Sequence, residues 1–219
     1  MKNILCFGDS NTWGYDPATQ TRFDNKTRWT GVLQENLGSK FNIIEQGLNG
    51  RTTKINESLD HNLGYAREFR SGIDILPVIY ESHSPLDMLV IMLGTNDLKI
   101  NFNRSAEMIA NDVKSVCKSV LESPYYCGHP IVLISPTHIN ENSNNLLDSF
   151  IGTKQTSISL APLYIEIAQE LGTLFLDASN VVTTNEIDGL HWDKYQHNEF
   201  GLYLSKFIKP KIVNLKDIN

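Results

Sequence analysis

The sequence predicts an α/β fold, a three-layer sandwich in which helices cover both faces of a mostly parallel five-stranded sheet. Two observations support this prediction. Short apolar runs alternate with longer segments of helical periodicity along the whole length, which is the pattern of successive βα units. The run LDMLVIML at residues 86–93 is almost continuously apolar, as expected of a strand that a parallel sheet buries on both faces.

The first elements follow from local signals. Residues 2–7 form a short apolar run that predicts the first strand, which ends at Gly8. Residues 29–37 predict a helix that stops at Gly38, because glycine is common just past a helix C-terminus. The run FNIIEQ at residues 41–46 predicts the second strand.

The middle of the chain supplies the third strand at 86–93, a helix over 105–121 and a fourth strand, PIVLIS, at 130–135. The helix is predicted because apolar residues recur on one of its faces at helical spacing. These residues are Met108, Ile109, Val113, Val116 and Val120.

The last third predicts a helix over 157–171 that ends before Gly172, and then a short strand over 173–177. A closing helix runs from 195 to about 208, with Pro210 just past it or kinking it. This gives five strands and completes the alternation.

Two stretches, residues 71–84 and 137–156, do not fit a minimal alternation of strands and helices. The second is polar around one small apolar patch. Insertions of this kind are typical of lids over a substrate or of contacts between subunits.

Composition narrows the class of protein. The 219 residues predict a single domain over residues 1–219, long enough to bury a core. A net charge of −6 without a basic patch argues against nucleic-acid binding. No apolar stretch approaches the length of a membrane span, and the first residues do not form a signal peptide, so we expect a cytoplasmic protein without a membrane role. Three widely spaced cysteines predict free thiols.

Polar, glycine-bearing turns follow four of the predicted strands. GDSN at 8–11 follows the first strand, GLNGR at 47–51 the second, GTND at 94–97 the third, and DGLH at 188–191 lies after the last. Ligands bind beyond the carboxyl ends of parallel strands. We therefore expect these turns to meet at one edge of the sheet.

Three side chains in these turns have the types needed for nucleophilic catalysis. Ser10 offers a hydroxyl, and His191 offers an imidazole whose free-solution pKa is about 6.5. Asp188 lies three positions before His191, a spacing that allows its carboxylate to accept the Nδ1 proton and leaves Nε2 free to act as a base. Taken singly, a serine or an Asp-Gly pair in a turn is more often structural.

The same turns offer donors for the oxyanion of acyl transfer, which several fixed N–H groups must stabilise. They are the backbone N–H of Ser10, the backbone N–H of Gly50 and the side-chain amide of Asn96. Each has a simpler reading alone, since Asn96 with Asp97 suits a helix cap and Gly50 suits a left-handed turn. Together they indicate an acyl-transfer site. The G-x-S-x-G motif of α/β-hydrolases and the phosphate-binding loop are both absent.

The blocks GDSNTWG, GLNGRTT, GTND and DGLHW resemble the four signature blocks of the SGNH (GDSL-type) hydrolases, in the same order from residue 8 to residue 192. The strings FGDSNTWG, RWTGVL, EQGLNGRTT and IMLGTND are similar to the bacterial arylesterase/acyltransferase branch. The resemblance implies a flavodoxin-like SGNH hydrolase fold, a triad and an oxyanion hole. The implied triad is Ser10, Asp188 and His191, and the implied donors are Ser10, Gly50 and Asn96.

The resemblance also suggests the substrate site and shows two departures. Asn11 stands where the family usually has leucine, and Trp192 where it often has a smaller apolar residue. By analogy with the branch, the residues nearest the catalytic atoms are Asn11, Thr95, Lys99 and Leu190, with Trp13, Tyr15 and Trp192 as walls. Crowded apolar surroundings favour small acyl groups such as acetyl, on aryl or short alkyl alcohols. Members of the branch often self-associate, so a homo-oligomer is expected.

We therefore expect a serine esterase that needs no metal or other cofactor and acts on small-molecule esters. Water or another alcohol would release its acyl-enzyme, and activity should rise with pH because the base must be neutral. A carbohydrate O-acetyl esterase and a thioesterase remain open alternatives, because the same triad serves them. A non-catalytic scaffold that binds a ligand at the same edge is disfavoured, since no triad member is missing.

Overall fold

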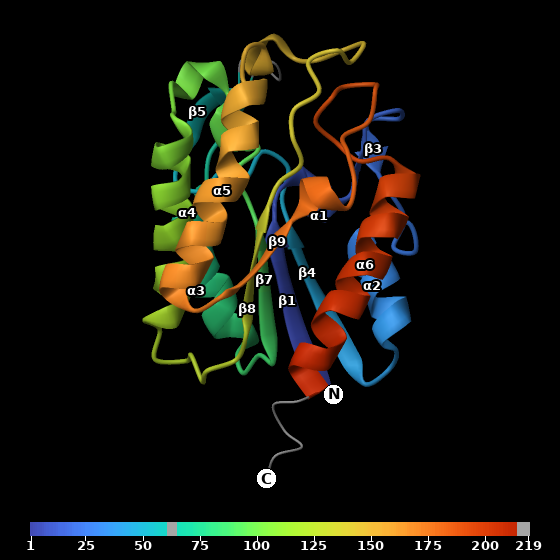
Figure 1. Ribbon diagram of the computed structural model, residues 1–219, viewed down its shortest axis with the longest axis vertical. Helices are drawn as coiled ribbons and strands as arrows, with labels where there is room; N and C mark the ends of the chain where they lie inside the picture. Colours follow the sequence, from blue (N-terminus) through green and yellow to red (C-terminus); the bar gives the residue numbers. More distant parts are fainter. Residues whose placement is uncertain (61–64, 214–219) are drawn as a thin grey trace.

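The computed structural model describes residues 1–60 and 65–213 (Figure 1). Its centre is one five-stranded sheet in which every neighbouring pair is parallel, in the order β4-β1-β7-β8-β9. Numbered along the chain, this order is 2-1-3-4-5, that of flavodoxin-like folds, and it confirms the predicted fold. The strands are β1 (Lys2–Gly8), β4 (Phe41–Gly47), β7 (Met88–Met92), β8 (Ile131–Ser135) and β9 (Leu174–Asp177).

Helices cover both faces of the sheet. Figure 1 shows α3, α4 and α5 on one side of the strands and α2 and α6 on the other. The six helices of the described chain are α1 (Ser10–Trp13), α2 (Trp29–Leu37), α3 (Gly72–His83), α4 (Ala106–Leu121), α5 (Lys154–Leu171) and α6 (Lys194–Val213). Short 3-10 turns are η1 (Asn96–Leu98), η2 (Ile100–Phe102), η3 (Asp148–Phe150) and η4 (Ala178–Asn180).

Two small hairpins lie outside the main sheet. One pairs β2 (Tyr15–Asp16) with β3 (Thr21–Arg22), and the other pairs β5 (Glu57–Asp60) with β6 (Tyr65–Arg67). The sequence pattern did not predict either of them, because strands this short carry too few residues to show a periodicity.

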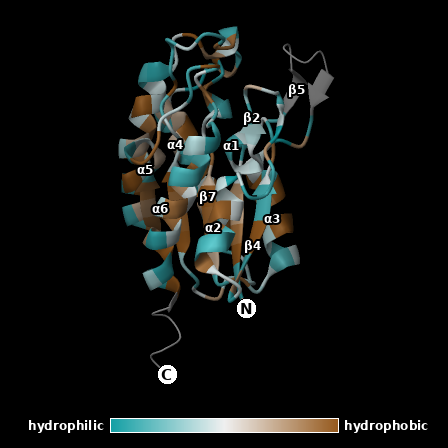
Figure 2. Ribbon diagram, turned by 90° about the vertical axis from the view of Figure 1, so that its right-hand side faces the viewer, coloured by the Kyte–Doolittle hydropathy of each residue, from teal (hydrophilic) through white to brown (hydrophobic). Residues whose placement is uncertain are grey.

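The core has two halves, one on each face of the sheet, because successive side chains of a strand point to opposite faces. Leu5 and Phe7 of β1 pack in the half under α3, α4 and α5, whereas Ile4 and Cys6 pack in the half under α2 and α6. All five residues of β7 are buried, which explains its unbroken apolar run. Figure 2 shows the apolar strands between helices whose outer faces are polar.

The chain order places the point where the strand order reverses beside β1. The chain leaves β1 towards β4 at one edge and later returns to β7 on the other side of β1. Where the order reverses, connections diverge to opposite faces and leave room for a ligand beyond the carboxyl ends. Gly8 is level with Gly47 and Met92 in the ladder, so the loops after these three strands begin at the same height, at the upper end of Figure 1.

Most predicted elements are confirmed, and their ends differ by a few residues. The stretch 71–84 is corrected, since it holds α3, the helix that connects β4 to β7. Pro77 lies inside this helix and removes one N–H from its ladder, but Leu76 and Tyr80 bury their side chains in the core. Pro210 likewise lies within α6, which continues to Val213.

The three cysteines of the described chain are free, as predicted. Cys6 and Cys117 are buried and Cys127 is exposed. Burial raises the pKa of Cys117 to about 12.

None of the helices in residues 1–60 and 65–213 combines the length and the apolar character that crossing a bilayer requires.

Candidate active site

The Ser10 hydroxyl is positioned by a helix of four residues. Asp9 caps α1, and its Oδ1 accepts a hydrogen bond from the Asn11 N–H at 3.0 Å. Gly14 ends the helix with φ of 86°, in the left-handed region where glycine carries no steric cost. Gly47 lies against the helix so closely that a Cβ there would sit 2.1 Å from the Trp13 nitrogen. Ser10 is thereby held at the carboxyl end of β1, and Asp9 braces the turn.

The side chains of Ser10, His191 and Asp188 form one hydrogen-bonded chain. Ser10 Oγ lies 2.8 Å from His191 Nε2, and His191 Nδ1 lies 2.6 Å from Asp188 Oδ2. The ring of Tyr15 lies against the imidazole, with ring centroids 4.5 Å apart. Residues 181 positions apart in the chain therefore meet in the order that a hydroxyl nucleophile, a base and an orienting acid require.

The carboxylate of Asp188 is held in its charged form. Burial raises the pKa of Asp188. Hydrogen bonds from the His191 side chain and from the backbone of His191 and Leu190 lower it by more, so the net pKa is below its ordinary value. Oδ1 accepts both backbone N–H groups at 3.0 Å. An ionised acceptor behind Nδ1 keeps the Nδ1 proton in place and leaves Nε2 facing Ser10 as an acceptor.

Asn185, which the sequence analysis missed, organises the loop that carries Asp188 and His191. Its Oδ1 accepts the N–H groups of Ile187 at 2.6 Å and Asp188 at 3.1 Å. Its backbone N–H and its Nδ2 both donate to the His191 carbonyl, at 2.9 and 2.7 Å. The available signal was an asparagine three residues before Asp188 in a polar loop, since asparagine often bonds to the backbone a few residues on.

Part of the predicted insertion at 137–156 lies along this loop. The backbone N–H of Asn140 donates to the Gly189 carbonyl at 3.0 Å, and that of Asn144 donates to the Glu186 carbonyl at 2.9 Å. Gly189 has φ of 70°, and a Cβ there would lie 2.2 Å from the Asn140 carbonyl oxygen. The insertion therefore supports the loop that holds Asp188.

Replacing Gly189 by alanine should shift this loop. The left-handed φ and the contact with Asn140 are both unfavourable for a side chain, so we expect the free energy of unfolding to fall by about 1–3 kcal/mol and kcat to fall with it. Gly128→Ala is the matched control, because Gly128 has φ of 80° but open space around it. Denaturation and ester assays on both variants make the comparison, and equal kcat values would contradict a role for this contact.

The three predicted oxyanion donors lie in neighbouring loops. Within the described residues, neither the Ser10 N–H nor the Gly50 N–H donates to a protein acceptor. Gly50 has φ of 76° in a turn closed by the Arg51 N–H and the Leu48 carbonyl at 3.0 Å. Asn96 Nδ2 donates one hydrogen to the Arg51 carbonyl at 3.0 Å, and its second hydrogen remains for another acceptor.

A buried carboxylate joins the loops of Gly50 and Asn96. Asp97 accepts the Thr53 N–H at 3.0 Å and the Thr53 hydroxyl at 2.6 Å. Burial raises the pKa of Asp97 to about 7, although the bonds from Thr53 oppose the rise. The guanidinium of Arg51 donates to the carbonyls of Gly8 and Gln46. The sequence analysis quoted Asp97 and Arg51 within motifs but gave Arg51 no role.

Four of the residues predicted to surround a substrate are buried or half-buried side chains. Thr95 and Lys99 are buried on either side of η1, and the Lys99 amine lies 5.8 Å from the Phe102 ring centre. Tyr15 lies on His191 as described above. Trp13 is half-buried, with the guanidinium of Arg22 5.1 Å from its ring centre.

One predicted contact is corrected, and two others have their side chains engaged inside the protein. Trp192 is 0% exposed and packs in the core against Phe200, so its side chain cannot be a wall of a substrate site. Leu190 is also nearly fully buried in the core. Asn11 lies next to Ser10 in sequence, and its amide bonds to the backbone of Leu190 and Trp192.

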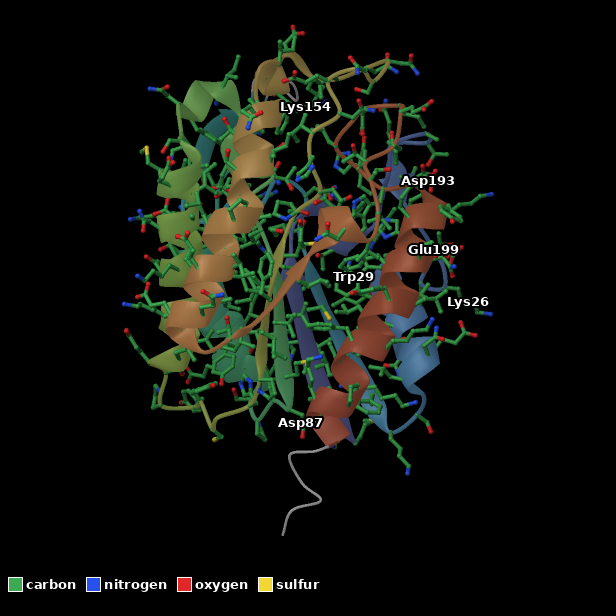
Figure 3. All side chains as sticks on the ribbon, viewed as in Figure 1. Lys26, Trp29, Asp87, Lys154, Asp193 and Glu199 are labelled. Carbon is green, nitrogen blue, oxygen red and sulfur yellow. The ribbon has the colours of Figure 1, made fainter. Side chains whose placement is uncertain are left out.

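A polar cavity of about 660 Å³ adjoins the loop of Asp188 through Asn185, and neither Ser10 nor His191 lines it. Lys154 and Asp193 also line it, and both are labelled in the upper half of Figure 3, near the beginnings of α5 and α6. Over residues 1–60 and 65–213, no three His, Cys, Asp or Glu side chains are grouped so as to hold a metal ion.

Comparisons with known proteins find a family and solved structures to which this chain is similar. Residues 6–200 match the model of the GDSL-like Lipase/Acylhydrolase family. The native aryl esterase of M. smegmatis is 34% identical, with a TM-score of 0.85 over 96% of this chain and 99% of that chain. A carbohydrate acetylesterase family member from Sinorhizobium meliloti is 33% identical, with a TM-score of 0.85 over 98% and 100% of the two chains. No curated protein matches significantly.

Proposed function

The chain belongs to the GDSL-like lipase/acylhydrolase family and is a carboxylic-ester hydrolase, and we propose that it hydrolyses short-chain, acetyl-type esters through an acyl-enzyme on Ser10. Transfer of the acyl group to an alcohol is a second outcome of the same intermediate. The observation that carries the proposal is the hydrogen-bonded chain from Ser10 Oγ through His191 to Asp188, with links of 2.8 and 2.6 Å.

In the proposed reaction, His191 Nε2 takes the Ser10 proton while Oγ forms a bond to the ester carbonyl carbon. The C–O bond to the alcohol then breaks, and His191 returns the proton to the departing oxygen. Water attacks the acyl-enzyme by the same route in reverse, with His191 again as the base. Asp188 remains ionised and holds the imidazole in the required tautomer throughout.

The proposed oxyanion hole consists of the N–H groups of Ser10 and Gly50 and the second amide hydrogen of Asn96. Their fixed loops support this role, because donors that need not reorganise stabilise the developing charge most. The bonds from Thr53 to Asp97 and from Asn96 to the Arg51 carbonyl hold two of the three loops together.

Labelling with a fluorophosphonate, followed by mass spectrometry, tests the proposal directly. We expect a single adduct on Ser10 and none in a Ser10→Ala variant. The chain offers a matched control in Ser179, whose hydroxyl lies 3.2 Å from His138 Nε2 but donates to Asp177 at 2.6 Å. Ser179→Ala should label normally. An adduct on Ser179, or on any residue other than Ser10, would overturn the proposal.

The preference for short acyl chains is tested with nitrophenyl esters of two to twelve carbons. The proposed nucleophile is only 7% exposed, and the ring of Tyr15 lies on His191. A confined site excludes long chains by overpacking. We expect kcat/KM to be highest for the acetate and to fall steadily with length. A maximum at eight carbons or longer would contradict this.

A carbohydrate O-acetyl esterase is the second candidate. Two acetylesterases from Sinorhizobium meliloti, at 33% and 30% identity, favour it. Parallel assays with aryl acetate, an acetylated sugar and an acyl thioester separate the possibilities. We expect the highest kcat/KM for aryl acetate, whereas a higher value for the sugar or the thioester assigns the enzyme to that substrate.

We further propose that the protein is a homo-oligomer. The turns η2 and η3 contact each other. Three apolar side chains at or beside them are 41–58% exposed: Ile100, Leu147 and Ile151. Apolar residues gathered in this way are typical of protein interfaces. Size-exclusion chromatography with light scattering should give a mass above 24.7 kDa, and a clean monomer would refute the proposal.

A further inference from the structure

We propose that Asn11 is a positioning residue that holds His191 in reach of Ser10, an inference that rests on the proposed function. Asn11 Nδ2 donates to the Leu190 carbonyl at 3.2 Å, and the Trp192 N–H donates to Asn11 Oδ1 at 3.1 Å. One amide therefore bonds to the residue before His191 and to the residue after it. The bonded groups are buried.

The Asn11 amide donates one hydrogen bond to this backbone segment and accepts one from it, as the backbone of a neighbouring strand would do. The residue next to the nucleophile in sequence bonds to both neighbours of the base. The Asn11 side chain is short and lies in a helix capped at both ends, so its position is tied to that of Ser10. A shift of the His191 backbone away from Ser10 would break two buried hydrogen bonds, and leaving buried polar groups unpaired costs about 1–3 kcal/mol each.

The topology explains why such a link is needed. Ser10 follows β1, whereas the loop of His191 follows β9 at the edge of the sheet, three strands away. The hydrogen bonds of the His191 backbone itself come from within its own loop, from Asp188 and Asn185. They set the shape of that loop, and Asn11 sets where the loop sits relative to the nucleophile.

The other polar backbone atoms around His191 are also engaged. Its N–H donates to Asp188 Oδ1, and its carbonyl accepts two bonds from Asn185. Leucine, the residue usual at position 11 in the family that the sequence resembles, has no polar atoms to replace the two bonds of Asn11. In this chain the base is therefore held from both sides by asparagine amides.

A double-mutant cycle tests the proposal with p-nitrophenyl acetate. In Asn11→Leu we expect kcat to fall by about 10- to 100-fold, because a misplacement of 1 Å costs about 10²-fold, while KM changes little. In a His191→Ala background the same change should leave the residual rate unaltered, because there is no base to position. The residual catalysis of triad variants, about 10³–10⁴ over water, is measurable.

Thr12→Val is the matched control, because Thr12 lies in the same helix, is 0% exposed, and its hydroxyl has no hydrogen-bond partner among the described residues. It should keep the activity whatever its melting temperature. If Asn11→Leu fails to fold, Asn11→Asp keeps the volume and the acceptor, and the same cycle applies to it.

The outcomes separate the two proposals. An equal loss of kcat in the normal and His191→Ala backgrounds, or no loss in either, would overturn the role of Asn11 and leave the triad standing. If His191→Ala itself retained full activity, the proposed function would fail first. A lower melting temperature with unchanged kcat would assign Asn11 to stability alone, which also overturns the inference.

Discussion

The Ser10→Ala variant is expected to lose ester hydrolysis by a factor on the order of 10⁶ in kcat. The variant removes the only atom that forms the covalent bond in the proposed reaction, and neither His191 nor Asp188 can replace it. The oxyanion donors and the substrate site remain, so a residual rate above that of water should persist. Steady-state kinetics with p-nitrophenyl acetate at high enzyme concentration measure both.

Stability should hardly change in this variant, and this separates a chemical role from a structural one. Ser10 Oγ makes its hydrogen bond to His191, and alanine suits a helix. Melting temperatures of the wild type and Ser10→Ala should therefore agree closely. The control is Ser179→Ala, which also removes a hydroxyl beside a histidine and should keep full kcat. A Ser10→Ala enzyme that retains more than a few per cent of kcat would exclude Ser10 as the nucleophile.

The fold was predictable because its strongest signals are local and redundant. The apolar run of β7 indicates a buried strand, and the glycines after α2 and α5 mark where these helices end. The alternation of strands and helices along the chain predicts the parallel sheet. The helix α3 was not predicted, because it contains Pro77 and the contacts of Leu76 and Tyr80 that stabilise it are tertiary. No local pattern contains that information.

The residue types of the candidate site were predictable from the sequence, but the hydrogen bonds that hold its loops in place were not. Ser10, Asp188 and His191 could be proposed from residue type and order, and the structure brings them into hydrogen-bond contact. The partners of Asn11 lie 179 and 181 positions away, and a short polar side chain gives no sign of which distant backbone it will meet. The same reason explains why Trp192 was expected beside a substrate and is found in the core.

The second large effect is expected at Asp188, the acid of the proposed triad. Asp188→Asn is expected to lower kcat by about 10⁴-fold without disturbing the loop. Asp188 Oδ1 accepts the backbone N–H groups of Leu190 and His191 at 3.0 Å, and only an oxygen can do this. The asparagine oxygen will therefore take that position, and its Nδ2 will replace Oδ2, 2.6 Å from His191 Nδ1.

The consequence is a change of tautomer. An amide N–H facing Nδ1 requires that nitrogen to be an acceptor, so the imidazole proton moves to Nε2. His191 then presents a donor to Ser10 and cannot take its proton. The loss should appear in kcat and in the rate of fluorophosphonate labelling, while KM changes much less.

The free energy of unfolding of this variant should also differ from the wild type in its dependence on pH. The pKa of Asp188 is below its ordinary value in the folded protein, so its charge favours folding above the unfolded pKa of about 3.9. That contribution disappears as the pH falls through the lower folded value. The difference in free energy of unfolding between the wild type and Asp188→Asn should therefore shrink between pH 6 and pH 3, as urea denaturation can measure.

Asp177→Asn is the control for both measurements, because Asp177 also lies beside a serine and accepts the Ser179 hydroxyl at 2.6 Å. It should leave kcat unchanged. A loss of less than about tenfold in Asp188→Asn would mean that the tautomer of His191 is set by something other than this carboxylate. Since Nδ1 bonds to Asp188 and Nε2 to Ser10, no other group in the described site holds either nitrogen, and the larger loss follows from the geometry.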